Sequence, residues 1–473
     1  MRRMIRLVTF AGLIGIVCLW GGCGNKEETL DGHEMQLMES EDVADIGYLS
    51  TEAGYMSAGV WQTAETQEEI VLTVGVVSEN SDFQKKIDLF EQEHPEYKIE
   101  VQLYDPADYG EDPFTQLKME IAAGKGPDVI NFGSDYSESA VAARLTDDLF
   151  EYMEEDEAFH IEDYFENILQ AFAVDRNLAA VPESYSIGTA AGLKQYYSDV
   201  EEWDFATLAE IYDSYCADHI LYPGESKLDV FSFLCTGTIA QYLDWQTVEC
   251  HFDSEEFAAL LQFADRFPEQ MIYSEDMKLR KLFAEGTALL YRTSISSVWG
   301  TGLDREMYAG QEIVYHGYPV TGNVAESGNI VLGINCNSDQ KAESWEFIKY
   351  FLSETYQAEK ANNLPLHRGA LQKRIEAASQ ITYTERSSEK VPVMKERYFE
   401  GEDPVQIAAI TKEDADTLYE LIESVHAAAD VDYSLYNIIL EEVQAYFSGD
   451  KELEDTVDVI QSRMKVAMAE KIR

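Results

Sequence analysis

Apolar and polar positions change period repeatedly from residue 70 onward. The run IVLTVGVV (70–77) is apolar and rich in β-branched residues, which predicts a strand. In the stretch that follows, Phe83, Ile87 and Phe90 fall at helical spacing, and Pro95 stands just beyond them. The pattern therefore predicts a strand followed by an amphipathic helix that ends before the proline.

The same order then repeats along the chain. IEVQLY (99–104) alternates apolar and polar residues like a strand, Phe114, Leu117 and Ile121 return to helical spacing, and DVINF (128–132) is another short apolar run. Strands that alternate with helices of this length predict a parallel sheet joined by right-handed crossovers. The expected fold class is therefore α/β.

The segment EIAAGKGPDVINFGSDY (120–136) contains a Gly-Lys-Gly that resembles a phosphate-binding loop. A phosphate loop leads from a strand into a helix and carries Ser or Thr after its lysine. Here the glycines follow a predicted helix and precede a predicted strand. Gly124 is therefore expected as the helix C-cap, with Pro127 where a helix cannot continue, and the sequence argues against a phosphate site.

Polar loops follow the carboxyl ends of the three predicted strands. They are SENSD (78–82), YDPADYG (104–110) and GSDYSES (133–139), and they carry hydroxyl, carboxylate, amide and phenol groups. Ligands of open α/β sheets bind beyond the carboxyl ends of the strands. The sequence thus predicts a binding site at this sheet edge, while any single residue of these loops also fits a solvated turn.

The N-terminus has the pattern of an export signal. Three arginines in MRRMIR precede an apolar run from Leu7 to Trp20 that is too short for a membrane span, and small residues then lead to Cys23. This resembles a bacterial lipoprotein signal, with a signal peptide over 1–22 and Cys23 as the lipid-bearing first residue of the mature chain. The alternative is an ordinary secretory signal with an incidental cysteine, since Trp20 stands where an aliphatic residue is usual.

Residues 23–70 are expected to form an acidic tether. Between residues 25 and 69 there are twelve acidic residues and one lysine, with Gly, Ser and Thr scattered among them. A self-repelling coil of about 45 residues spans roughly 35–40 Å. Such a tether would hold a folded body clear of a membrane.

The amino-acid composition indicates which classes of partner the chain can bind. The chain has 473 residues, of which 89 are acidic and 35 basic, and its formal net charge is −54. A surface this acidic repels the phosphates of nucleic acids and anionic lipid head groups, so both are poor partners. A hydrophobic content of 45% and an aromatic content of 12% predict a globular body large enough for two domains.

No motif in the sequence specifies a catalytic or metal centre. The chain has no H-E-x-x-H, G-x-S-x-G or nucleotide P-loop. GTGLDR (300–305) lacks the third glycine of a dinucleotide loop, and DPADYGED (105–112) misses the spacing of a calcium loop. Neither a metal nor a cofactor is expected.

Four cysteines remain beyond the signal, and none stands in a C-x-x-C pair: Cys216, Cys235, Cys250 and Cys336. An oxidising compartment permits disulfides among them. They fit equally well as small buried residues in a large core.

Several segments of the chain, taken in order, resemble those of a known protein family. FEQEHPEYKIEVQLY followed by LKMEIAAGKGPDVINFG resembles the extracellular solute-binding proteins of ABC importers, in the branch that includes maltose- and oligosaccharide-binding members. The resemblance covers roughly 71–473 and depends on the serial order of loose motifs. Those further along are LAAVPESYSIGTAAGLKQYY, ECHFDSEEFAALLQFADRFP, LFAEGTALLYRTS, GYPVTG, GINCNSDQKAESWEFIKYFLSETYQ, NLPLHRGAL, LYNIILEEVQAYFSGD and TVDVIQSRMKVAMAEK.

The resemblance implies a fold of the type II periplasmic-binding-protein class, in which two α/β lobes joined by a hinge enclose an interlobe cleft. Carried onto this chain, lobe one comprises 71–182 plus 293–352, and lobe two comprises 183–292 plus 353–473. Closure of the lobes is then a hinge motion, and selectivity is a differential affinity of the ligand for the closed state.

Candidate ligand-binding residues follow from the chemistry of a sugar, which has apolar C–H faces and a rim of hydroxyls. Aromatic rings cover the faces, and carboxylates, amides and guanidiniums bind the hydroxyls. Trp299 also fits a core position, and Arg292 could instead pair with a nearby acid. The candidates at the positions that the resemblance places near the cleft are Glu79, Asn80, Asp135, Tyr136, Glu183, Tyr185, Arg292, Ser294, Trp299 and Arg368.

The resemblance implies a membrane-anchored extracellular protein that captures a sugar or oligosaccharide by lobe closure and delivers it to the permease subunits of an ABC transporter. A monomer without catalytic activity is expected, extracytoplasmic and lipid-anchored to the outer face of the cell membrane through Cys23. Two alternatives stay open: a secreted glycoside-acting enzyme, and a surface binding or sensing protein without a transporter.

Overall fold

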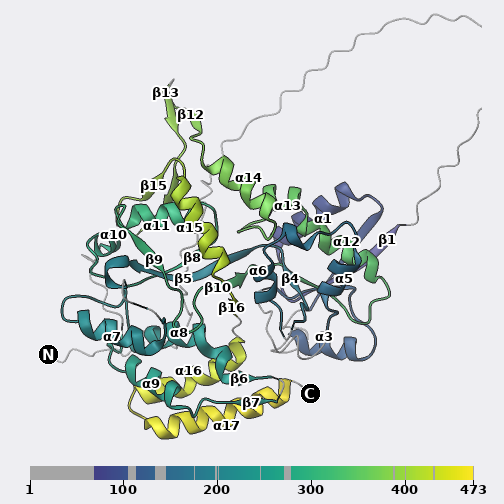
Figure 1. Ribbon diagram of the computed structural model, residues 1–473. Coiled ribbons are helices and arrows are strands. Elements are labelled where there is room, and N and C mark those ends of the chain that lie inside the picture. Colours follow the sequence, from purple (N-terminus) through teal and green to yellow (C-terminus); the bar gives the residue numbers. More distant parts are fainter. Residues whose placement is uncertain are drawn as a thin grey trace, which may run out of the picture.

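Two mixed sheets, each with its own helices, form two lobes that lie side by side (Figure 1). The first lobe contains β1 and the second contains β5. The computed structural model describes residues 69–104, 113–133, 145–174, 176–197, 200, 202–245, 247–270, 278–386, 389–399, 401–429 and 432–471.

The first sheet has the strand order β2-β1-β3-β11-β4. β1 is parallel to β2 and β3, whereas β11 is antiparallel to β3 and β4. The alternation of strands and helices predicted from residue 70 onward is therefore confirmed. The elements are β1 (Ile70–Val76), α1 (Ser81–Glu93), β2 (Tyr97–Leu103), α3 (Pro113–Ala122), β3 (Val129–Asn131), β4 (Val181–Pro182) and β11 (Val331–Ile334).

Both faces of the first sheet are covered because its strands are apolar on both sides. Val129 and Ile130 are adjacent on β3 and point to opposite faces. Val129 belongs to the large core that includes Phe90 of α1, and Ile130 to a smaller cluster with Leu117 and Ile121 of α3. The further helices of this lobe are α5 (Leu149–Glu155), α12 (Lys341–Leu352) and α13 (Glu354–Glu359), whereas α6 (Glu166–Ala171) contacts β10 and β16 of the second sheet.

The Gly-Lys-Gly segment ends α3, as predicted. Gly124 has φ +71°, the left-handed conformation that favours glycine at a helix C-terminus, and its N–H donates to the carbonyl of Ile121 at 2.9 Å. The chain then turns directly into β3. These glycines therefore terminate a helix and do not open a phosphate loop.

The second sheet has the order β16-β10-β5-β8, with β9 also paired to β5. Its long central strand β5 is buried along its whole length and antiparallel to β8, β9 and β10. The strands are β5 (Tyr185–Leu193), β8 (Tyr291–Ile295), β9 (Ile313–Tyr315), β10 (Val324–Ser327) and β16 (Ala427–Ala428).

A separate helical core lies beneath the second sheet in Figure 1, where α16 and α17 run along the lower edge. Phe231, Phe252 and Phe257 are fully buried there and pack edge to face. The helices of this lobe are α7 (Phe205–Tyr215), α8 (Lys227–Thr238), α9 (Glu255–Ala264), α10 (Leu279–Ala284), α11 (Gly300–Met307), α15 (Lys412–Glu423), α16 (Tyr433–Phe447) and α17 (Leu453–Lys471).

The remaining elements are small. α14 (Arg368–Ala378) follows α13, and a two-stranded ribbon projects from the body (Figure 1). Short 3-10 turns occur at Ile161–Asp163, Lys194–Tyr196 and Ile239–Tyr242. The minor strands are β6 (Leu243–Asp244), β7 (Glu249–Cys250), β12 (Tyr383–Arg386), β13 (Glu389–Pro392), β14 (Lys395–Arg397) and β15 (Val405–Ile407).

Among the described residues, no helix combines the length and the apolar character needed to cross a membrane. The four cysteines in this part of the chain form no disulfide: Cys235 and Cys250 are buried, and Cys216 is exposed. The burial of Cys235 and Cys250 fits the second interpretation of the sequence, in which cysteines are small buried residues of a large core.

The sheet pairings differ from the lobe boundaries expected from the sequence. The sequence placed the return to lobe one at 293, but β8, β9 and β10 all pair with or beside β5, so the chain stays in the second sheet until Ser327. At 353, where the sequence placed the passage to lobe two, the helix that follows, α13, contacts both α12 and α14. A strand-like pattern does not reveal which sheet the strand joins.

Within the described part of the chain, three segments lie together where the chain passes between the lobes. The first is Glu183–Ser184 between β4 and β5, and the second is Gly328–Ile330 between β10 and β11. They run together, because the N–H of Glu183 donates to the carbonyl of Ile330 at 2.9 Å. The third follows α13, where Leu364 and Tyr185 exchange backbone hydrogen bonds of 2.8 and 3.1 Å.

A buried ion pair secures the first crossing. Lys86 of α1 lies 2.6 Å from Glu183, and their side chains are 8% and 3% exposed. The Tyr356 hydroxyl donates to the same carboxylate at 2.6 Å, and Gln357 donates to the Glu183 backbone carbonyl at 2.6 Å. These contacts link α1, the first crossing and α13, so the hinge region is a packed polar cluster.

Replacing Lys86 with methionine should destabilise the fold strongly, because the Glu183 carboxylate would stay buried without its cation. Loss of one partner of a buried pair costs about 3–5 kcal/mol. Lys98→Met is the matched control, since the Lys98–Glu91 pair is exposed and worth less than about 1 kcal/mol. Denaturant unfolding measures both, and equal effects of the two substitutions would contradict the assigned role of Glu183.

Candidate functional site

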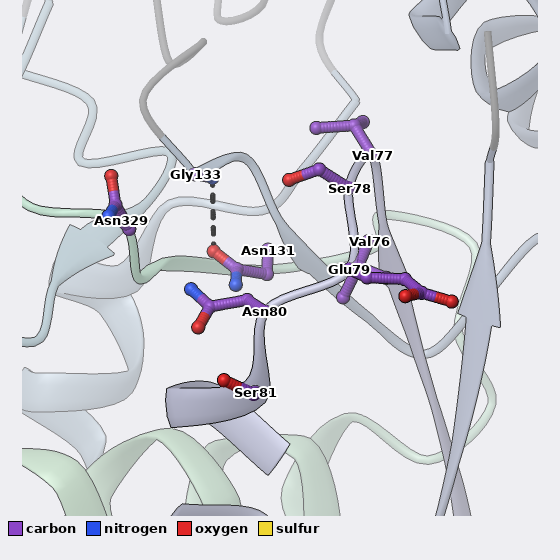
Figure 2. A pocket seen from close by; sticks show the side chains of 9 residues that line it. All are labelled: Val76, Val77, Ser78, Glu79, Asn80, Ser81, Asn131, Gly133 and Asn329. Carbon is purple, nitrogen blue, oxygen red and sulfur yellow. Dashed lines mark hydrogen bonds between the residues drawn. The ribbon is translucent and has the colours of Figure 1, made fainter. Parts of the chain in front are cut away.

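A pocket opens where β1 and β3 end. It has a volume of about 360 Å³ and lies between the β1–α1 turn, the end of β3 and the crossing that leads to β11 (Figure 2). This is the carboxyl edge of the first sheet, where the sequence predicted a site. The pocket is lined by Val76, Val77, Ser78, Glu79, Asn80, Ser81, Asn131, Gly133 and Asn329.

Asn80 has two functions in this pocket because its amide has two ends. Its Oδ1 accepts hydrogen bonds from the backbone N–H groups of Asp82 and Phe83 at 3.0 and 3.1 Å, so Asn80 is the N-cap of α1. The cap orients the amide, and Nδ2 remains on the other side. Figure 2 shows Asn80 directed toward Asn131, whereas Glu79 extends from the opposite side of the turn.

Asn131 is oriented by the sheet in the same way. It is 4% exposed, and its Oδ1 accepts from the N–H of Gly133 at 3.0 Å and of Val331 at 2.9 Å. Asn329 comes from the second crossing and is exposed. Because the backbone fixes these amide oxygens, Asn80 and Asn131 present N–H donors in defined directions.

The pocket is lined by hydrogen-bonding groups and by one carboxylate. It offers three amides, two serine hydroxyls and the Glu79 carboxylate, and its lining residues include neither an aromatic ring nor a cation. Amides and carboxylates match the paired donors and acceptors of a polyhydroxylated solute. Among the described residues, no cluster of three or more His, Cys, Asp or Glu is arranged to hold a metal ion.

A second polar group lies on the second sheet. Ser294 of β8 and Ser186 of β5 donate to one oxygen of Glu326 at 2.6 and 3.1 Å. Glu326 is 8% exposed, and burial raises the pKa of its carboxyl from 4.5 to about 7, with the two hydroxyls and Arg292 opposing that effect.

Arg292 lies beside this group and is paired with an acid, as one reading of the sequence allowed. Its guanidinium is 3.2 Å from Asp229 and stacks over the rings of Tyr222 and Phe233, with ring-centre distances of 5.4 and 5.0 Å. The Arg292 side chain is still 36% exposed. Arg292 is therefore a planar donor held by aromatic rings, and it retains surface for another partner.

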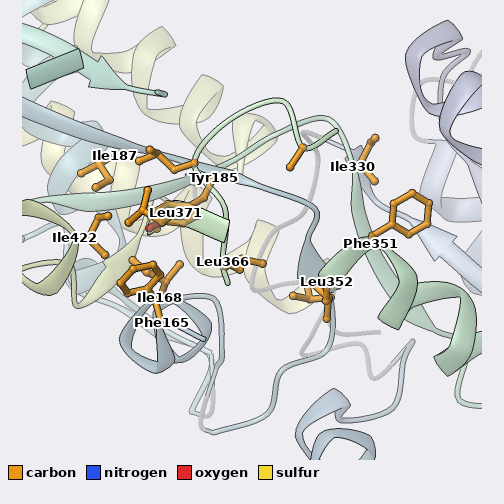
Figure 3. Packing of buried hydrophobic residues seen from close by; sticks show 14 of the residues in the cluster. Phe165, Ile168, Tyr185, Ile187, Ile330, Phe351, Leu352, Leu366, Leu371 and Ile422 are labelled. Atoms are coloured by element: carbon orange, nitrogen blue, oxygen red, sulfur yellow. The ribbon is translucent and has the colours of Figure 1, made fainter. Parts of the chain in front are cut away.

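Two predicted site residues of the first crossing lie in the packed hinge. Glu183 is in the ion pair with Lys86, and Tyr185 is fully buried. Figure 3 shows the Tyr185 ring among Ile187, Leu371 and Ile422. In contrast to the expectation from the sequence, neither side chain has a surface to offer a ligand in this arrangement, because the crossing passes through the core.

The other predicted residues are divided between the lobes. Trp299 is partly buried against the core beneath Lys395, whose ammonium is 5.7 Å from the ring centre. Arg368 stacks over Phe165 at 4.4 Å and donates to the carbonyl of Tyr164, so its contacts are within the fold. Asp135, Tyr136 and Cys23 lie outside the described residues.

The structure thus brings Glu79 and Asn80 together with two residues that the sequence did not single out. Asn131 is the last residue of β3 and the last but one of the predicted strand 128–132, so it stands at the strand end where ligands bind. Asn329 and Glu326 carried no such signal, because their position depends on which sheet each neighbouring strand joins.

Residues 76–358 match the family model described as bacterial extracellular solute-binding protein. The sugar-binding protein MalE from Xanthomonas citri is similar over 85% of this chain and 98% of its own, with 16% identity and a TM-score of 0.51. A substrate-binding protein from Listeria monocytogenes in complex with cycloalternan covers 85% and 99%, with 15% identity and a TM-score of 0.48.

No curated protein sequence matches this chain. The family match confirms the resemblance stated from the sequence, and with the shared fold it confirms the predicted α/β fold of two lobes of the type II periplasmic-binding-protein class. The matching family is one of binding proteins.

Glu326 should make stability depend on pH in a defined direction. Its pKa is about 7 in the folded chain against an ordinary 4.5, so its contribution to the free energy of unfolding is full below pH 4.5 and is lost as the pH rises to 7. Glu326→Gln removes this titration. The free energy of unfolding of the variant minus that of the natural chain should rise by about 3 kcal/mol between pH 4.5 and 7.5.

The control is Glu423→Gln, which makes the same chemical change at an exposed position. Its difference from the natural chain should stay flat over the same range. Urea unfolding at several pH values measures these differences, and a flat curve for Glu326→Gln would show that the buried carboxyl does not titrate there.

Proposed function

Because this chain belongs to the family of bacterial extracellular solute-binding proteins, we propose that it captures a sugar or an oligosaccharide by closing its two lobes and delivers it to the permease subunits of an ABC importer. The observation that supports this most directly is the pocket at the carboxyl edge of the first sheet. It is lined by oriented amides and adjoins a crossing between the lobes.

The proposed ligand is a neutral, hydroxyl-rich solute. Asn80, Asn131 and Asn329 would bind its hydroxyls from the first lobe, and Arg292 and Ser294 would meet it from β8 of the second lobe on closure. Asp135 and Tyr136 stay in the proposed set. Arg292 can also hydrogen-bond a hydroxyl while paired with Asp229, since a guanidinium has five N–H donors.

We propose lobe boundaries that follow the sheets. The first lobe comprises 71–182 and 331–359, and the second comprises 185–327 and 379–471, with α14 beside the hinge. In each lobe the proposed contacts stand on elements with a buried face, and the connecting crossings carry the change of angle between the lobes.

The proposed location is extracytoplasmic, in keeping with a family of extracellular proteins. Lipidation of Cys23 and the acidic segment that follows would anchor the body to the outer face of the membrane as a monomer. We further propose binding without turnover. The solute would leave the site unchanged when the permease accepts it.

A sugar that binds this chain should stabilise it and should depend on the amide of Asn80. A ligand that binds only the folded form raises stability by about 2.7 kcal/mol at a hundredfold excess over its Kd, which a thermal-shift screen of mono- and oligosaccharides detects. Asn80→Asp keeps the capping oxygen but loses the N–H donor. It should weaken binding of the screened sugar about tenfold or more, as measured by tryptophan fluorescence.

Asn437→Asp on α16 is the matched control, because Asn437 is exposed and lies outside the pocket lining. It should leave the affinity unchanged. Equal affinity in Asn80→Asp would remove the pocket from the ligand site. A flat response to the whole sugar library would reject carbohydrate as the ligand, and a chemically altered sugar would reject binding without turnover.

Cys23→Ser should release the protein from the cell membrane, because the lipid is attached through the thiol. Fractionation of expressing cells should recover the natural chain with the membranes and the variant in the medium, and labelled palmitate should enter only the former. Cys216→Ser, which changes an exposed cysteine of the body, is the control. Retention of Cys23→Ser on the membrane would contradict the lipid anchor.

A further inference from the structure

One carboxylate joins three strands of the second sheet. Glu326 of β10 faces Ser186 of β5 in the antiparallel register, and Ser294 of β8 reaches it from the far side of β5. Both hydroxyls donate to the same oxygen, Oε2, at 3.1 and 2.6 Å. The carboxylate therefore bridges β10, β5 and β8 through side-chain hydrogen bonds in addition to the backbone ladder.

The position of this bridge relative to the hinge is specific. Ser186 is the second residue of β5, directly after the first crossing, and Glu326 is the last residue but one of β10, directly before the second crossing. The two crossings also run together at Glu183 and Ile330. The Glu326 carboxylate thus ties the two crossings at the point where both enter the second lobe.

A glycine in β5, Gly188, leaves space for this carboxylate. A Cβ atom at Gly188 would lie 2.3 Å from Oε1 and 2.8 Å from the carboxyl carbon of Glu326, and real Cβ atoms do not approach so closely. Gly188 pairs with Ser294 in the ladder between β5 and β8. The carboxylate therefore occupies a space that the backbone of β5 leaves for it.

The electrostatic surroundings differ from those of the other buried hinge carboxylate. Glu183 is paired directly with Lys86, but Glu326 has no ion pair among the described residues. The charge that acts on it is that of Arg292 of β8, which pairs with Asp229, and the Tyr318 phenol of the segment before β10 is neutral because its pKa is raised.

The other elements packed on β10 add little charge. The facing positions of β5 are Ser186 and Gly188, and β16 contributes Ala427 and Ala428. The charged residue of α6, which contacts β10, is Glu166, and its side chain is exposed. Protonation of Glu326 is therefore decided by its burial, by the two hydroxyls and by Arg292.

We propose that Glu326 is a positioning residue for lobe closure, whose protonated carboxyl holds the lobe-two ends of the two crossings together and whose ionisation loosens them. The proposal rests on the lobe closure of the proposed function. Glu326 is 8% exposed and its carboxyl lies in the space beside Gly188, so the packed arrangement suits the neutral acid better than the anion, which needs water or a cation. The angle between the lobes is then held tightly below the pKa of Glu326 and varies more widely above it.

The test measures the distance between the lobes without ligand, so its result does not depend on whether a sugar binds. The full mature chain carries nitroxide labels on the exposed natural Cys216 of the second lobe and on Glu100→Cys of the first, in a Cys336→Ser background. Pulsed electron resonance then gives the distance distribution from pH 5.5 to 8.5. The expected distribution is narrow at pH 5.5 and broad at pH 8.5, with its half-way point near pH 7.

Glu326→Gln, whose amide resembles the protonated carboxyl, should give the narrow distribution at every pH. If that variant fails to fold, the double variant Ser186→Ala, Ser294→Ala keeps the carboxyl and removes its two donors, and it should be broad throughout. The exposed control Glu423→Gln should behave like the natural chain. A distribution in the natural chain that does not change with pH, or a response of Glu326→Gln equal to that of the natural chain, would overturn the proposal.

Discussion

The buried carboxylate of Glu183 determines where the two lobes join. With only 3% of its side chain exposed, it needs a cation and hydrogen-bond donors, and it obtains them from Lys86 of α1 and Tyr356 of α13. These partners come from segments on either side of the first crossing. The crossing therefore has one path, and the register of β5 and of the strands paired with it follows from that path.

The same helix connects this anchor to the pocket. Asn80 caps the start of α1, and Lys86 binds Glu183 six positions later, which is about 9 Å along a helix axis. A solute held by Asn80 and a hinge held by Lys86 thus act on one short rigid element. On the far side of the hinge, Glu326 ties the crossings to the second sheet with hydroxyl donors in place of a cation. The two ends of the hinge are consequently secured by contacts of different strength.

Local pattern was enough to predict β1, β2 and β3 of the first sheet, the helices between them and the glycine cap at Gly124, because these depend on spacing within about twenty residues. The pocket residues Glu79 and Asn80 were predicted because ligands of open α/β sheets bind beyond the carboxyl ends of the strands. The burial of Glu183 and Tyr185 did not follow, since it arises from α13 and α14, which are distant in sequence. Asn329 and Glu326 gained their positions only from the antiparallel strands β10 and β11, whose sheet membership a local pattern does not specify.

The charge of the chain constrains the ligand more than it constrains the fold. A formal charge of −54 repels anionic solutes at long range, and salt screens that field beyond about 8 Å, so the local site decides what binds. The pocket lining contains Glu79 and no cation, and Arg292 of the second sheet already has Asp229 as its partner. An anion would therefore meet repulsion both on approach and in the pocket. A neutral solute would avoid both, and its hydroxyls would find amide donors whose directions are set by the cap of α1 and by the first sheet.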